Sequence, residues 1–140
     1  MRVVIDTNVL VSAVIRDRLP ERVVLWCLGQ ADVECLVTPE VMAEYAAVIR
    51  RPKFALPRET IDWWLELLAL DTRPIAPTVE LDFPRDRKDA PFLICAQSGQ
   101  ADYLITGDGD FSEAQPLIDP RIVSVRQFAG IIGLESPAFQ

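Results

Sequence analysis

Histidine is absent from this sequence of 140 residues, and its absence narrows the chemistry that the protein can perform. Without an imidazole, the chain can contain no Ser-His-Asp or Cys-His catalytic site, no histidine-ligated zinc and no histidine general base. Any catalysis by this chain must therefore depend on carboxylates.

Cysteine is scarce, and the thiols are spread along the chain. Cys27, Cys35 and Cys95 are odd in number and include no close pair, so neither a disulfide framework nor a thiolate zinc site is indicated. We expect all three to be buried thiols, because free cysteine is among the most buried residue types.

Long apolar runs are also missing. No segment reaches the roughly 18 consecutive apolar residues of a membrane span, and the apolar run at the N-terminus ends at Asp6, too early for the core of a signal peptide. We therefore expect a cytoplasmic protein. Half of the residues are apolar and a quarter are charged, which predicts one globular domain spanning residues 1–140.

Basic residues are outnumbered, and the formal net charge is −7. This balance argues against a general nucleic-acid coat protein, which needs a basic surface, but it does not exclude a nuclease. Nine of the 14 basic residues fall in three local groups, each of which could hold phosphate or form a solvated face. The groups are Arg16, Arg18 and Arg22; Arg50, Arg51 and Lys53; and Arg85, Arg87 and Lys88.

Short apolar runs alternate with helical patterns along the chain. We expect strands at 3–5, 33–37, 102–106 and 122–125, an extended segment at 72–79, and helices from about 8, at 20–29, 39–51, 57–70, 90–97 and 127–132. Strands separated by helices indicate crossover connections and a parallel sheet. The pattern thus predicts a three-layer α/β fold, in which ligands collect outside the carboxyl ends of the strands.

Acidic residues follow two of the predicted strands. Asp6 ends the first strand where the chain turns into a helix, which suits a metal ligand but also a helix N-cap. Asp108 and Asp110 follow the strand at 102–106 on a glycine-loosened turn, although an ordinary turn would use the same residues. Both segments are expected at the carboxyl edge of the sheet.

Two further acids lie on predicted helices. Asp89 opens a helix, where an N-cap would also explain it, and Asp86 is a fallback for the same role. Glu44 shares the spacing of an apolar helix face with Val41 and Val48, where an ionised carboxylate is costly unless an arginine or a metal ion pairs with it.

These acids come from distant parts of the chain but are expected at one rim of the sheet. Clustered carboxylates repel one another unless a divalent cation neutralises them, and hard oxygen ligands select Mg²⁺ or Mn²⁺. Such ions can activate water for in-line attack on a phosphodiester, which leaves a 5′-phosphate and a 3′-hydroxyl. The sequence therefore predicts a metal-dependent nuclease.

Four segments, taken in chain order, resemble the PIN-domain family. They are the strand with Asp-Thr-Asn at residues 4–10, Glu44, the helix start Asp-Ala-Pro-Phe at 89–92, and Ile-Thr-Gly-Asp-Gly-Asp-Phe at 105–111. The resemblance spans nearly the whole chain and is greatest to bacterial and archaeal PIN-family toxins of toxin–antitoxin systems, a group similar to the VapC ribonucleases.

The resemblance implies a three-layer α/β/α PIN-like fold and a role for each acid. Its core acids would be Asp6, Glu44 and Asp89, with Asp108 as the fourth and Asp110 as an auxiliary, although either of the last two could be the direct ligand. Asn8 and Thr106 would orient the carboxylates and metal-bound water by hydrogen bonds. The resemblance also implies Mg²⁺ or Mn²⁺ dependence, an RNA substrate, a homodimer and a cognate antitoxin.

Other functions share parts of this pattern. A catalytically silent PIN domain could act as a nucleic-acid or protein binding module, and a structure-specific DNA nuclease would use the same chemistry. A phosphotransfer domain also gathers aspartates, but a phosphatase of that kind wants a second aspartate where Asn8 stands. For the dimer, Trp63 and Trp64 offer an apolar helix surface, unless they belong to the core.

Overall fold

The computed structural model describes residues 1–81, 88–107 and 109–134. Within them, five parallel strands form one sheet in the order β3-β2-β1-β4-β5. The strands are β1 (Arg2–Ile5), β2 (Glu34–Val37), β3 (Thr72–Pro74), β4 (Tyr103–Ile105) and β5 (Arg121–Val123).

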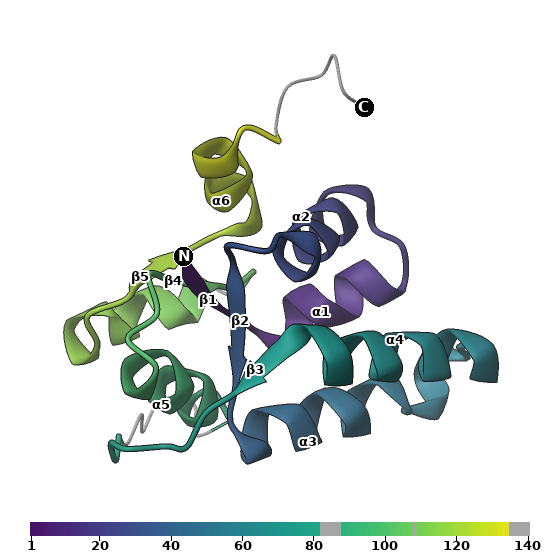
Figure 1. The fold of residues 1–140 in the computed structure, drawn as a ribbon, viewed down its shortest axis with the longest axis horizontal. Helices are drawn as coiled ribbons and strands as arrows, with labels where there is room; N and C mark the ends of the chain where they lie inside the picture. Colours follow the sequence, from purple (N-terminus) through teal and green to yellow (C-terminus); the bar gives the residue numbers. More distant parts are fainter. Residues whose placement is uncertain (82–87, 108, 135–140) are drawn as a thin grey trace.

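Helices cover both faces of the sheet (Figure 1). They are α1 (Thr7–Val14), α2 (Arg18–Gly29), α3 (Pro39–Ile49), α4 (Arg58–Asp71), α5 (Ala90–Ser98) and α6 (Val125–Ile132), with 3₁₀-helices η1 (Pro52–Phe54) and η2 (Gly109–Leu117). α1 and α2 pack together on one side of β1 and β2, whereas α5 lies on the other side and contacts α3. The predicted three-layer α/β/α fold with a parallel sheet is confirmed.

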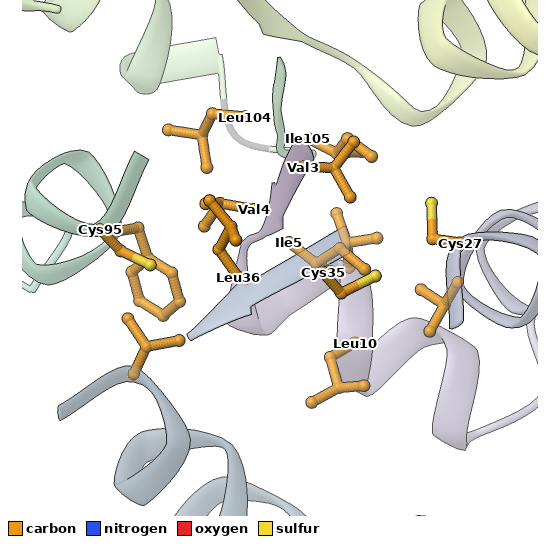
Figure 2. Packing of buried hydrophobic residues seen from close by; sticks show 14 of the residues in the cluster. Val3, Val4, Ile5, Leu10, Cys27, Cys35, Leu36, Cys95, Leu104 and Ile105 are labelled. Atoms are coloured by element: carbon orange, nitrogen blue, oxygen red, sulfur yellow. The ribbon is translucent and has the colours of Figure 1, made fainter. Parts of the chain in front are cut away.

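The core is built around the central strand β1. Val3, Val4 and Ile5 are all buried, as expected for a strand covered on both faces, and Figure 2 shows apolar side chains on either side of them. Cys95 reaches the core from α5 on one face, and Cys27 reaches it from α2 on the other. Cys27, Cys35 and Cys95 are free and buried, which confirms the prediction for the three cysteines.

The strand order reverses next to β1. The chain passes from β1 to β2 and β3 on one side, and then returns to β4 and β5 on the other. The register of the parallel pair β1 and β4 places Ile5 beside Ile105. The residues that follow these two strands, Asp6 and Thr106, therefore leave the sheet side by side at the switch point, where α/β folds bind ligands.

Three segments differ from the sequence-based expectation. The extended segment at 72–79 contains a short edge strand, β3, whose last residue Pro74 is tolerated because the strand lies at the sheet edge. α2 begins at Arg18 rather than at residue 20. The 3₁₀-helix η2 lies where we expected a turn, since Asp, Gly and Pro favour both kinds of tight backbone.

The last helix begins earlier than predicted because Ser124 forms a capping box. The Ser124 Oγ atom accepts a hydrogen bond from the Gln127 backbone at 3.0 Å, and the Gln127 side chain accepts one from the Ser124 backbone at 2.8 Å. α6 therefore starts at Val125, and β5 ends at Val123. Among all described residues, no helix has the length and apolar character needed to cross a membrane.

Candidate metal centre

Asp6 lies at the carboxyl end of β1 and is 3% exposed. It occupies the N-cap position of α1, but its side chain makes no capping hydrogen bond. Instead, Oδ2 of Asp6 accepts a hydrogen bond from the hydroxyl of Thr106 at 3.0 Å. Helix capping, the simplest structural explanation of Asp6, is therefore not what its carboxylate does.

Backbone hydrogen bonds fix the position of this pair. The Asp6 amide donates to the Ile105 carbonyl at 2.9 Å, and the Thr106 amide donates to the Val123 carbonyl at 2.9 Å. Both residues thus continue the hydrogen-bonded ladder of the sheet by one step beyond their strands. The orientation of Thr106 toward Asp6 agrees with the positioning role that the family resemblance implies for this threonine.

Glu44 lies on the side of α3 that the spacing predicted, at the border of its apolar face. Val41, Tyr45 and Val48 are buried, whereas Glu44 is only half-buried. Oε2 of Glu44 accepts a hydrogen bond from the hydroxyl of Thr7 at 2.5 Å. Its carboxylate forms no ion pair with any arginine that the structure describes, so the salt-bridge explanation of this residue is not met either.

Asp89 occupies the N-cap position of α5 and is 8% exposed. Its backbone is helical, with φ −82° and ψ −22°, whereas capping residues are usually extended. Accordingly, its side chain makes no capping hydrogen bond. Pro91 lies in the first turn of α5, where a proline is tolerated. Asp89 is thus a second buried carboxylate whose position is not explained by helix capping.

Tyr45 connects the three elements that carry these acids. Its hydroxyl donates a hydrogen bond to the carbonyl of Ile5, the residue before Asp6, and the next residue on its helix is Glu44. Its ring packs against that of Phe92 on α5, with 6.2 Å between centroids. β1, α3 and α5 are therefore tied together through one side chain.

The surroundings of Tyr45 keep its hydroxyl neutral. Burial raises the pKa of Tyr45 well above its ordinary value of 10.0. The thiols of Cys95 and Cys35 and the carboxylates of Asp6 and Glu44 raise the pKa further, because each disfavours a second negative charge nearby. At neutral pH, Tyr45 is therefore a hydrogen-bond donor. Since Asp6 and Glu44 both affect its pKa, both carboxylates lie near the Tyr45 hydroxyl.

Several predicted residues cannot be assigned a place in this cluster. Asp86 and Asp108 lie outside the described residues. Asp110 is the second residue of η2. Asn8 is exposed on the first turn of α1. Among the residues that the structure describes, no three acidic or cysteine side chains lie close enough together to hold a metal ion.

The available donors nevertheless have the chemistry of a magnesium or manganese site. Asp6, Glu44 and Asp89 offer hard carboxylate oxygens, which Mg²⁺ and Mn²⁺ prefer. Burial raises the pKa of the Cys95 thiol to about 12, so at neutral pH this side chain is a protonated thiol and not a thiolate ligand. The donor set therefore fits a hard divalent cation better than zinc.

Sequence reasoning missed two residues of this site, Thr7 and Tyr45. Thr7 stands inside the Asp-Thr-Asn motif, but its partner Glu44 is 37 residues away, so no local pattern links them. Tyr45 lies on the buried face of α3, and burial alone does not distinguish it from an ordinary core residue. The signal that could have identified both is their adjacency in sequence to the predicted acids Asp6 and Glu44.

The three-layer α/β fold places a buried aspartate at the end of its first strand, beside a threonine from the adjacent strand, at the edge where α/β proteins bind ligands. A PIN-domain family model matches residues 2–110, more than half of the chain, and the chain therefore belongs to the PIN-domain family. No curated protein matches it.

One similar solved structure is the crystal structure of VapBC2 from Rickettsia felis bound to a DNA fragment from their promoter. The match has a TM-score of 0.62 and 13% sequence identity, and it covers 89% of this chain and 98% of the other. At this identity the likeness concerns the fold alone. It agrees with the three-layer α/β/α architecture described above.

Proposed function

We propose that this protein is a metal-dependent endoribonuclease that hydrolyses RNA phosphodiester bonds. Membership of the PIN-domain family supports a nuclease, and the observation that carries the proposal is the state of Asp6 and Asp89. Both are buried carboxylates at helix N-cap positions, yet neither caps its helix. Burying carboxylates is costly, and a bound cation would offset that cost.

In this proposal Asp6, Glu44, Asp89 and Asp108 hold the ion, and Asp110 assists. When bound, Mg²⁺ or Mn²⁺ would supply the charge that lowers the pKa of water and neutralises the scissile phosphate. Thr106 positions one donor, because its hydroxyl donates a hydrogen bond to Oδ2 of Asp6. Asn8, two residues after Asp6 in the first turn of α1, is exposed and in the proposal orients metal-bound water. Because the chain has no histidine, we propose that one of these carboxylates accepts the proton from the attacking water.

We further propose that the protein is the toxin of a toxin–antitoxin pair. The resemblance of its acidic motifs to VapC-like ribonucleases supports this assignment, as does the likeness of its fold to a VapBC2 complex. The proposal includes a cognate antitoxin, a homodimer, a cytoplasmic location and a single PIN domain over residues 1–140.

Cleavage of a mixed single-stranded RNA in the presence of Mn²⁺, Mg²⁺ or EDTA tests the ribonuclease proposal. We expect cleavage with either metal, none with EDTA, and products that carry 5′-phosphates and 3′-hydroxyls. Cleavage that persists in EDTA, or products with 2′,3′-cyclic phosphates, would refute metal-activated hydrolysis. A chain that neither binds Mn²⁺ nor cleaves RNA would instead support a catalytically silent PIN domain that acts as a binding module.

A further inference from the structure

We infer that Thr7 is a positioning residue that orients Glu44 toward the metal, an inference that rests on the proposed function. Thr7 is the first residue of α1 and is 7% exposed. Its Oγ1 atom lies 2.5 Å from Oε2 of Glu44 on α3, so the hydroxyl donates to the carboxylate across two elements. α1 and α3 pack directly against each other, which places the two side chains in contact.

The chemistry of this hydrogen bond suits a positioning role. A hydroxyl that donates to an ionised carboxylate makes a charge-assisted hydrogen bond, which is stronger than one between neutral groups. A threonine in the first turn of a helix more often bonds to nearby backbone groups. Here the hydroxyl of Thr7 instead serves an acid 37 residues away, which a purely local structural role does not require.

The bond also restricts the orientation of the Glu44 carboxylate. Thr7 engages one lone pair of Oε2, which leaves Oε1 and the other lone pair of Oε2 to bind a cation. Glu44 forms no ion pair within the described part of the chain, and no basic side chain there draws its carboxylate away. A glutamate has several rotatable bonds, and fixing them before the ion arrives reduces the entropy lost when it binds.

Thr7 and Thr106 form a matched pair at the switch point of the sheet. Thr7 comes two residues after the end of β1, and Thr106 comes directly after the adjacent strand β4. Thr106 donates to Asp6, and Thr7 donates to Glu44, so each hydroxyl serves a carboxylate from a different segment of the chain. The fold thus supplies one hydroxyl for each of two proposed ligands.

Calorimetric titration of Mn²⁺ into the full chain tests this inference with three variants. Thr7→Val keeps the shape of the side chain but removes the donor, Thr7→Ser keeps the donor, and Thr60→Val on α4 is a control that removes a hydroxyl away from the acids. We expect Thr7→Val to weaken Mn²⁺ binding by about 10-fold or more, the usual effect of losing a hydrogen bond to a metal ligand. Thr7→Ser and Thr60→Val should bind within about 2-fold of the intact protein, since both keep the bond to Glu44.

Unchanged Mn²⁺ binding by Thr7→Val, in an intact protein that does bind Mn²⁺, overturns the role of Thr7 and leaves the proposed function standing. An intact protein that binds no Mn²⁺ overturns both. If Thr7→Val does not fold, Thr7→Ala removes the same hydroxyl together with the methyl group and carries the same expectation. Thermal unfolding in EDTA separates loss of the fold from loss of the metal.

Discussion

The hydroxyl of Thr106 donates a hydrogen bond to Oδ2 of Asp6 at 3.0 Å, across 100 residues of sequence. The two residues meet because β1 and β4 are adjacent parallel strands, with Ile5 beside Ile105. The position of the Asp6 carboxylate is therefore set by sheet topology as well as by its local motif.

Removing the Thr106 hydroxyl should impair the metal site without unfolding the protein. We expect Thr106→Val to lower Mn²⁺ affinity and RNA cleavage by about 10- to 100-fold, because Asp6 loses the donor that orients it. Thr106→Ser should retain most of both. The measurement is Mn²⁺ titration together with initial cleavage rates, and a Thr106→Val variant as active as the intact protein would contradict the prediction.

Truncating the two neighbouring tryptophans of α4 should destabilise the protein to different extents. Trp64 is 4% exposed and Trp63 is 53% exposed, although their rings touch edge to face. Trp64→Ala should lower the free energy of unfolding by about 3 to 5 kcal/mol, as expected for a large core side chain. Trp63→Ala should lower it by about 1 kcal/mol or less. Urea unfolding of both variants tests this, and equal losses would contradict it.

The exposed Trp63 provides a selective test of self-association through α4. Of the two tryptophans on α4, only Trp63 is exposed enough to contact a second copy of the chain. Trp63→Lys should therefore disrupt an α4 interface and leave the core around Trp64 intact. We expect the intact protein to have a dimer mass in light scattering and Trp63→Lys to have a monomer mass. A dimer mass in both would place the interface elsewhere on the molecule.

Alkaline pH should destabilise the protein partly through Cys95. Burial raises the pKa of this thiol from 9.0 to about 12, while a backbone hydrogen bond from Thr38 opposes the rise. Below pH 9, both the folded and the unfolded chain keep the proton. Between pH 9 and 12, the unfolded chain releases it first, so the free energy of unfolding falls as the pH rises.

The matching measurement is urea unfolding of the intact protein and Cys95→Ala between pH 8 and 11. The alanine variant should start less stable, because it leaves a small cavity, but should lose less stability as the pH rises. Parallel losses in the two proteins would show that Cys95 does not contribute. The same burial predicts that the folded protein resists alkylation of this thiol at pH 8 and reacts once it is denatured.

Much of the fold could be predicted because its signals are local. The apolar run of β1 and the alternation of strands and helices indicated the parallel sheet, and Asp6 was correctly expected at a strand end. The surroundings of the acids were harder to predict from the sequence. Whether Asp6 caps α1 depends on Thr106 from a distant strand, and the half-burial of Glu44 depends on how α3 meets Thr7.

The different burial of the two tryptophans follows from helix geometry. Consecutive residues of a helix point about 100° apart, so Trp63 and Trp64 could not both face the core or both face solvent equally. The start of α6 was predicted wrongly, although Ser124 and Gln127 have the spacing of a capping box that could have indicated it. The strand β3 could not be predicted, because proline is unusual in strands and only the edge position accommodates Pro74.

The most direct test of the central claim compares Asp6→Asn with Asp62→Asn in Mn²⁺ binding and RNA cleavage. Asp62 is an exposed acid on α4 that pairs with Arg58, so its variant changes the net charge equally without touching the site. The account predicts that Asp6→Asn loses Mn²⁺ binding and at least about 100-fold of the cleavage rate, while Asp62→Asn behaves like the intact protein. Full Mn²⁺-dependent cleavage by Asp6→Asn would contradict it.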